Sequence, residues 1–145
     1  MKKEIIAIVV AAVVLIGLIV FFGLRSGQSN VNFETVSQKS MPRELEAEIL
    51  PEYRELERAL ACRVGEEVYV LVTRGEKPTS GYEVEIDKLI LENKDSKSNL
   101  VVYATFADPS EPENMAQITS YPVAVVKADM KGLPDTIELR AEFAE

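Results

Sequence analysis

Residues that commonly carry enzymatic chemistry are scarce in this chain of 145 residues. It contains no histidine and a single cysteine, Cys62, so neither a Ser-His-Asp triad nor a Cys-His dyad can form within it. A zinc site is disfavoured for the same reason, because carboxylates alone prefer harder ions. Lys77 and Ser80 lie three positions apart, but without a second motif they more simply belong to a turn. The sequence predicts a protein that is not an enzyme, with no catalytic residues, no metal site and no cofactor.

Carboxylates are the remaining candidates for chemistry. Glu83, Glu85 and Asp87 share one face of a predicted strand, where an acid-base pair is conceivable, but a solvent-facing outer face explains them more simply. The acidic loop 108–114 could offer oxygen ligands to calcium, yet its prolines and the lack of EF-hand spacing favour a solvated turn. Cys62 is expected to be a small buried residue at the end of a helix, with an intermolecular disulfide as the alternative.

The segment 75–82, with the sequence GEKPTSGY, is the most distinctive candidate for binding. Two glycines and a proline impose an unusual backbone path between two predicted strands, and the hydroxyl groups offer hydrogen bonds. A plain strand connection is the simpler alternative, but loops on a rigid scaffold often carry binding. The candidate partner-binding residues of this segment are Gly75, Lys77, Pro78, Thr79, Ser80, Gly81 and Tyr82.

A run of 20 apolar residues, 5–24, lies between charged flanks near the N-terminus. At 1.5 Å per residue a helix of this length reaches about 30 Å, which matches the hydrocarbon core of a bilayer. Lys2 and Lys3 precede the run, so the positive-inside rule predicts a cytoplasmic stub at 1–4. No signal-peptidase site follows the run. We expect an uncleaved transmembrane anchor at 5–24, a linker at 25–32 and an extracytoplasmic domain at 33–145.

The region after Arg25 carries 13 basic and 23 acidic residues, a net charge of −10. This charge opposes binding to nucleic acids and anionic lipids, which needs clustered Lys and Arg. The length of the region suits one domain with its own core. Because there is one cysteine, the domain must be stabilised by packing and not by internal disulfides.

Apolar spacing in this region predicts helix first and strands afterwards. Pro51 interrupts a stripe at helical spacing, which predicts two short helices or one kinked helix; the stripe comprises Leu45, Ile49, Tyr53, Leu56 and Leu60. An extended piece is expected at 31–38. Period-two patterns predict five further strands, at 68–74, 82–91 with a bulge near Lys88, 100–106, 121–128 and 137–143. The predicted fold class is α+β, with one or two short helices packed on an antiparallel β-sheet of about five or six strands.

Three motifs occur in order along this region: G-x-K-P-T-x-G-Y at 75–82, an acidic proline-rich loop after the third predicted strand, and T-x-Y-P at 119–122. Together they resemble the C-terminal domain of PrcB-type subunits of bacterial surface protease complexes, over residues 68–129. The resemblance implies a non-catalytic accessory that helps a partner protease assemble or remain stable at the cell surface. It adds Tyr121 and Pro122 to the candidate partner-binding residues.

The hypothesis from the sequence is a membrane-anchored, non-catalytic accessory or stabilising subunit of a cell-surface protease complex. It would be a single-pass protein of the bacterial cell membrane with its C-terminal domain outside the cytoplasm. Its partners would be the membrane, through residues 5–24, and another protein such as a surface protease, with no nucleic acid. The alternative is direct inhibition of a protease through the 75–82 loop, because KPTSGY is similar to a loop that chagasin-type inhibitors insert into the clefts of cysteine proteases.

Overall fold

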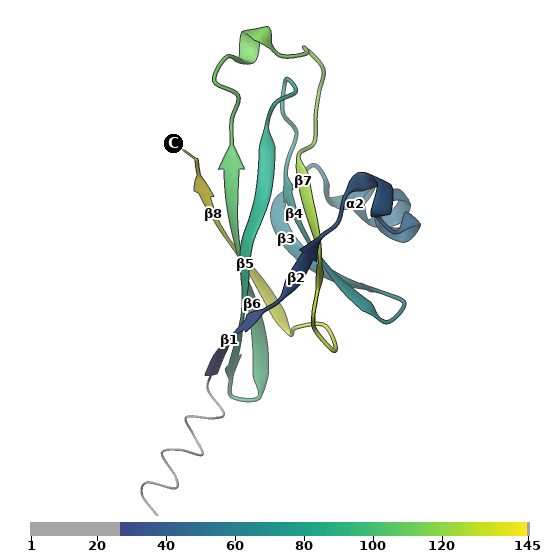
Figure 1. Cartoon of the computed structure of the whole chain (residues 1–145), viewed down its shortest axis with the longest axis vertical. Coiled ribbons are helices and arrows are strands. Elements are labelled where there is room, and N and C mark those ends of the chain that lie inside the picture. The colour runs from purple at the N-terminus through teal and green to yellow at the C-terminus, as the bar shows by residue number, and fades with distance from the viewer. Residues whose placement is uncertain (1–26, 145) are drawn as a thin grey trace, which may run out of the picture.

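The computed structural model describes residues 27–144, which form two β-sheets of four strands each (Figure 1). Sheet A has the strand order β1-β5-β6-β8 and sheet B has the order β2-β7-β4-β3. The strands are β1 (Gly27–Val31), β2 (Phe33–Thr35), β3 (Glu57–Val64), β4 (Glu67–Arg74), β5 (Glu83–Lys94), β6 (Lys97–Ala107), β7 (Val123–Ala128) and β8 (Thr136–Phe143). Short helical segments lie between them: η1 (Gln38–Ser40), η2 (Leu45–Ile49), α2 (Leu50–Tyr53) and η3 (Pro112–Asn114).

The predicted α+β class is wrong, because the described chain is mostly β and forms two sheets, not one sheet under helices. The expected helical stripe ends at Tyr53, and its last member, Leu60, belongs to β3. Ala59 and Leu60 are both buried, but Ala59 packs between the two sheets and Leu60 packs under the helical segment. Consecutive residues of a strand point to opposite faces. Because β3 is covered on both faces, its apolar residues do not alternate with polar ones, and Leu60 fitted the helical spacing by coincidence.

The helical segment 45–53 accommodates Pro51 without an interior break. A π-helical turn, η2, directly precedes α2, and Pro51 is the second residue of α2. Leu45 is fully buried against Leu60, Leu71 and Val125 on the outer face of sheet B. Burial of one leucine stabilises this attachment by about 2 kcal/mol.

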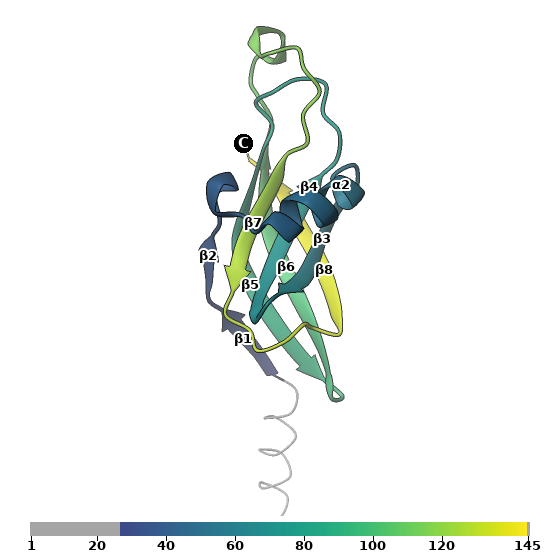
Figure 2. The same ribbon diagram turned by 90° about the vertical axis from the view of Figure 1, so that its right-hand side faces the viewer.

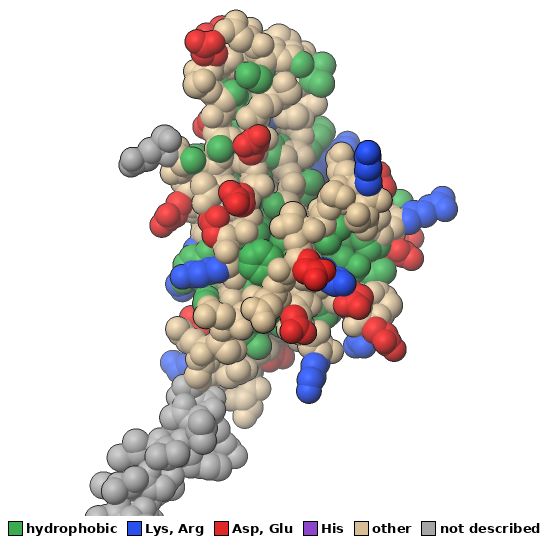
Figure 3. Space-filling view, viewed as in Figure 1, with side chains coloured by type: hydrophobic (Ala, Val, Ile, Leu, Met, Phe, Trp, Pro, Cys, Tyr) green, Lys and Arg blue, Asp and Glu red, His purple; other side chains and the backbone are tan. Residues whose placement is uncertain are grey.

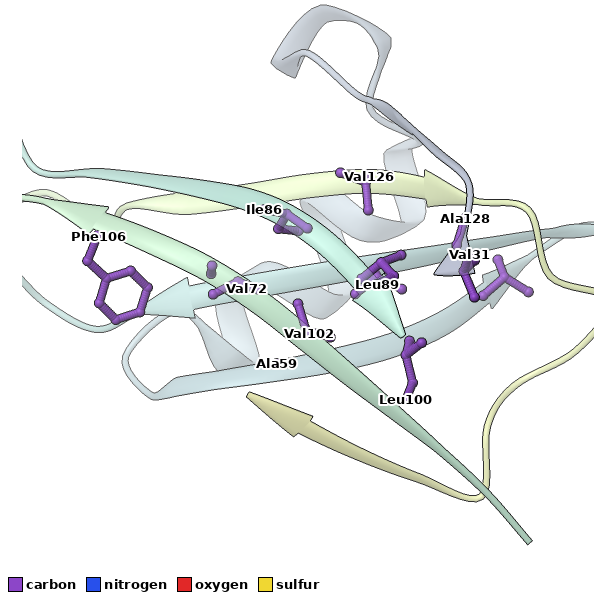
Figure 4. Packing of buried hydrophobic residues seen from close by; sticks show 13 residues of the cluster. Val31, Ala59, Val72, Ile86, Leu89, Leu100, Val102, Phe106, Val126 and Ala128 are labelled. Atoms are coloured by element: carbon purple, nitrogen blue, oxygen red, sulfur yellow. The ribbon is translucent and has the colours of Figure 1, made fainter. Parts of the chain in front are cut away.

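Most of the main core lies between the two sheets. Valines at alternate positions of β4 face it, because β4 is an interior strand of sheet B. Side chains from sheet A meet them from the other side (Figure 4); the buried cluster includes Val68, Val70, Val72, Ile86, Leu89, Leu100, Val102 and Phe106. Cys62, expected at a helix end, instead lies half-buried in β3.

The strand positions were predicted better than their pairing. The bulge expected near Lys88 is present, since the β5–β6 register shifts between Ile86 and Lys88. However, β8 runs parallel to β6, which contradicts the expected antiparallel arrangement. After β7 the chain crosses to sheet A, where the carboxylate of Asp135 accepts a hydrogen bond from the backbone N–H of Ser98 at 2.7 Å. The start of β8 is therefore held beside the start of β6, and the two strands point the same way.

The first described residues also differ from the expected linker at 25–32. Gly27–Val31 is strand β1 and pairs with Leu89 to Asn93 of β5, because its extended polar sequence can serve as an edge strand. The chain then crosses at Asn32 to sheet B as β2. The predicted transmembrane segment 5–24 lies outside the described residues. None of the helices within 27–144 has the length and apolar character needed to span a membrane.

Candidate functional site

Two loops lie side by side at the end of the molecule opposite β1 (Figures 1 and 2). One is the predicted binding segment 75–82, which joins β4 to β5, and the other is 108–122, which joins β6 to β7 and contains η3. We call these two segments the apical loop pair. They extend beyond the ends of both sheets (Figure 2), so a large partner could approach them without meeting the rest of the domain.

Backbone and hydroxyl hydrogen bonds tie the two loops together. Lys77 and Ser120 exchange backbone hydrogen bonds of 2.8 and 3.0 Å, and the Ser120 hydroxyl donates to the carbonyl oxygen of Thr79 at 2.7 Å. The backbone N–H of Ser80 donates to the carbonyl oxygen of Ala116 at 3.0 Å, and the N–H of Ala116 donates back to the Ser80 hydroxyl oxygen at 3.1 Å. The pair is therefore a pre-organised unit, which lowers the ordering cost of binding.

Gly81 is required for the close contact of the two loops. Its φ of +93° lies in the left-handed region, which side chains with a Cβ rarely adopt. A Cβ at this position would come within 2.8 Å of the Met115 sulfur and 3.1 Å of the Pro109 Cβ. The glycine noted in the sequence thus serves a packing role between the loops.

Arg74, at the end of β4, anchors the base of the apical loop pair. Its side chain is buried, and it donates hydrogen bonds to the carbonyl oxygen of Ala107 at 3.1 Å and to the carboxylate of Asp108. The guanidinium carbon lies 4.9, 5.3 and 5.5 Å from the ring centres of Phe106, Tyr82 and Phe143. One cation therefore connects both loops to the last residues of β8.

The predicted partner-binding residues come together at this end, but they differ in exposure. Gly75, Thr79 and Pro122 are buried, and the Thr79 hydroxyl donates to the adjacent carbonyl oxygen of Ser80 at 2.9 Å. Pro78 and Gly81 are exposed; Lys77, Ser80, Tyr82 and Tyr121 are half-buried. Several of these residues shape the loops and leave little of their own side chain for a partner.

Tyr121 joins the apical loop pair to the helical segment. The guanidinium carbon of Arg54, just after α2, lies 4.2 Å from the centre of the Tyr121 ring. The neighbouring carbonyl oxygen of Pro122 accepts a hydrogen bond from the backbone N–H of Arg74 at 3.2 Å. These contacts hold the C-terminal end of the loop 108–122, whereas the contact between Arg74 and Asp108 holds its N-terminal end.

Sequence reasoning missed two residues that matter at this end. Arg74 is the last residue of the predicted strand 68–74, and a charged residue at the end of such an apolar run, directly before Gly75, is a usable signal. Ile118 is an apolar side chain that is 63 % exposed on the apical loop pair, and no local pattern distinguished it. Loops carried on a rigid scaffold often bind other molecules, so this exposed side chain is a candidate contact for a partner.

Within 27–144 there is no group of three or more His, Cys, Asp or Glu side chains that could hold a metal ion. The carboxylate of Asp87 accepts a hydrogen bond from the Thr105 hydroxyl at 2.6 Å on an exposed strand face. Partial burial raises the pKa of the Cys62 thiol, which reduces the fraction of reactive thiolate.

A comparison with protein families finds a match for part of the chain. Residues 68–129, from β4 through β7 to Asp129, match the family model described as PrcB C-terminal. Residues 68–129 are therefore similar to the PrcB C-terminal domain. No curated protein and no solved structure gives a significant match to the chain. The PrcB C-terminal segment includes Arg74 and the whole apical loop pair, and the family is an accessory family, not a catalytic one.

Proposed function

We propose that this chain is a membrane-anchored accessory subunit of a cell-surface protease complex, and that the apical loop pair binds its protein partner. The family assignment supports an accessory role in a protease complex. The observation that carries the binding site is the pre-organised pair of loops, hydrogen-bonded to each other and anchored by Arg74. The apolar run 5–24 would place the domain outside the cytoplasm.

The arrangement of the domain is compatible with this orientation. Gly27, the first described residue, belongs to β1 at the end of the molecule opposite the apical loop pair (Figure 1). An anchor that precedes β1 would leave the apical loop pair facing away from the membrane. Protease treatment of intact cells tests the location: degradation of the domain supports the proposal, and protection of the domain in cells whose other surface proteins are degraded contradicts it.

The binding test compares two exposed apolar residues at opposite ends of the domain. Ile118 lies on the apical loop pair, and Leu133, 52 % exposed, lies in the β7–β8 connection. We expect Ile118→Asp in the full chain to lower recovery of a stoichiometric partner from membranes by about tenfold or more, because a buried interface contact contributes more than about 1.4 kcal/mol. Leu133→Asp should leave recovery unchanged. Equal effects of the two variants would contradict a binding site on the apical loop pair.

Direct protease inhibition through 75–82 is the alternative. The loop 75–82 is poorly suited to insert into a protease cleft, because Thr79 is buried and the neighbouring loop 108–122 covers part of it. Inhibition of cysteine or serine proteases by the full chain, abolished by Pro78→Asp, would support the inhibitor. Binding of a protease without inhibition would support the accessory role.

A further inference from the structure

The outer edge of sheet A is open along the first half of β5. Strand β1 covers only Leu89 to Asn93, because the chain leaves for sheet B at Asn32. Across the described part of the chain, no backbone group pairs with residues 83–88 on the edge facing away from β6. Alternate residues of this six-residue stretch therefore present unpaired N–H and C=O groups over about 20 Å, the type of edge to which another strand can add.

A groove of about 460 Å³ runs beside this open edge. Val84, Glu85 and Ile86 form one wall. The other wall comprises the first four residues of β7 and the two loop residues before them, Tyr121 and Pro122, with Val36 and Met41 near the helical segment. Strands β5 and β7 are neighbours in space (Figures 1 and 2), yet no ladder of hydrogen bonds joins them within 27–144. The open edge is thus bordered by apolar side chains on the side that faces sheet B.

The other side of the open edge is acidic. Glu83 and Glu85 are exposed, whereas Val84 is half-buried and Ile86 is buried. Glu85 pairs with Thr105 of β6, which pairs with Glu142 of β8, so a second carboxylate lies in the same row of the sheet. Acidic side chains are visible over the upper parts of β5, β6 and β8 (Figure 3). A neighbouring strand would be favoured here if it placed positive charges beside Glu83 and Glu85.

We propose that the open edge 83–88 binds an extended segment of a partner protein in which Lys or Arg alternates with apolar residues. The segment adds a strand to sheet A through backbone hydrogen bonds. Its basic side chains lie beside Glu83 and Glu85, and its apolar side chains enter the groove beside Val84 and Ile86. Apart from Tyr121 and Pro122, the residues of this surface lie outside the apical loop pair, so the inference is tested separately from the function proposed above.

A blocked octapeptide of alternating lysine and valine tests the proposal. It is titrated into the isotopically labelled full chain in uncharged detergent micelles, and backbone amide shifts are recorded by NMR. We expect saturable shifts centred on 83–88 and on β7 across the groove. A glutamate-valine octapeptide should bind at least tenfold more weakly, and so should lysine-valine peptides N-methylated at alternate residues, because they cannot form the backbone ladder.

Charge reversal provides the matched control. The double variant Glu83→Lys with Glu85→Lys should reverse the preference, so that the glutamate-valine peptide binds more tightly. The double variant Glu46→Lys with Glu48→Lys makes the same change in net charge at exposed sites in η2, and should keep the preference for the lysine-valine peptide. Retention of the original preference by the β5 variant, or its reversal by the η2 variant, would overturn the proposal.

The same titration separates other occupants of the edge. Equal binding of methylated and unmethylated peptides would show charge attraction without strand addition and would overturn the proposal. Shifts at 83–88 that depend on protein concentration, in the absence of peptide, would show that a second copy of the chain covers the edge and would also overturn it.

Discussion

Replacing Arg74 with methionine tests whether one buried cation holds the apical loop pair in place. The side chain is 2 % exposed and donates hydrogen bonds to the carbonyl oxygen of Ala107 and the carboxylate of Asp108. Its guanidinium carbon also lies 5.3 Å from the ring centre of Tyr82 and 5.5 Å from that of Phe143. Methionine has a similar length and no charge, so it keeps much of the packing and removes the polar contacts.

The expected loss of stability follows from these contacts. A hydrogen bond from a charged group, such as that to Ala107, contributes about 1.5–3 kcal/mol. The ion pair with Asp108 contributes less than about 1 kcal/mol, since the Asp108 side chain is 53 % exposed and water screens it. The ring contacts add about 1 kcal/mol. Removing the Arg74 Nε, which is buried without a partner in the described region, returns about 1 kcal/mol. The net decrease in the free energy of unfolding is about 2–4 kcal/mol.

Urea denaturation of the full chain in micelles, monitored by tyrosine fluorescence, measures this decrease. Hydrogen exchange of amides in 76–81 and 109–120 measures the local effect, and it should accelerate more than exchange in β4 and β6. Arg58→Met is the matched control, because Arg58 is exposed and its guanidinium carbon lies 5.3 Å from the Tyr53 ring centre; it should lose less than about 1 kcal/mol. Our reasoning is refuted if Arg74→Met is as stable as Arg58→Met and exchange in both loops is unchanged.

Three further predictions concern the backbone turns and the thiol. Gly81→Ala should lower the free energy of unfolding by about 1–3 kcal/mol in urea denaturation, because its Cβ would overlap Met115. Gly65→Ala is the control, since Gly65 has a φ of +62° but open space around it, and this variant should lose only about 1 kcal/mol. Equal losses in the two variants would contradict the packing role of Gly81. Ser96→Gly should raise the free energy of unfolding by about 0.5 kcal/mol, because Ser96 has a φ of +65°, a left-handed conformation that glycine adopts without steric cost. A decrease in the free energy of unfolding would contradict this prediction. Because the pKa of Cys62 is raised, the native state holds the thiol proton more strongly than the unfolded state does. The contribution of Cys62 to stability should therefore be present below the ordinary thiol pKa and should fall as the pH rises through the raised pKa. A Cys62→Ala variant should lack this alkaline decrease, measured by urea denaturation across the pH range.

The accuracy of the strand predictions depended on how much of each pattern was local. The β5 prediction succeeded, including the bulge, because Val84 and Ile86 alternate with charged residues and Leu89 resumes the apolar pattern out of phase. The helix prediction failed at Leu60 because β3 is covered on both faces. A strand buried on both sides shows no alternation, so its apolar residues can fit a helical spacing by coincidence.

The sequence predicted where the candidate site lies, but not which of its side chains are buried and which are open to a partner. The glycines and proline of 75–82 marked an unusual loop, and the structure shows why Gly81 is needed there. The inward position of Thr79 and the anchoring role of Arg74 depend on 108–122, which is distant in the sequence. No pattern within 75–82 could show which of its side chains the other loop covers.

The sequence by itself determined the order of most strands, the PrcB C-terminal segment and the lack of histidine-based chemistry. Those properties follow from residue types and short spacings. The tertiary structure alone decided the two-sheet fold, the parallel direction of β8 and the open edge of β5. Strand partners and directions are set by contacts between distant segments, since a backbone N–H or C=O has the same hydrogen-bonding capacity whichever strand lies beside it.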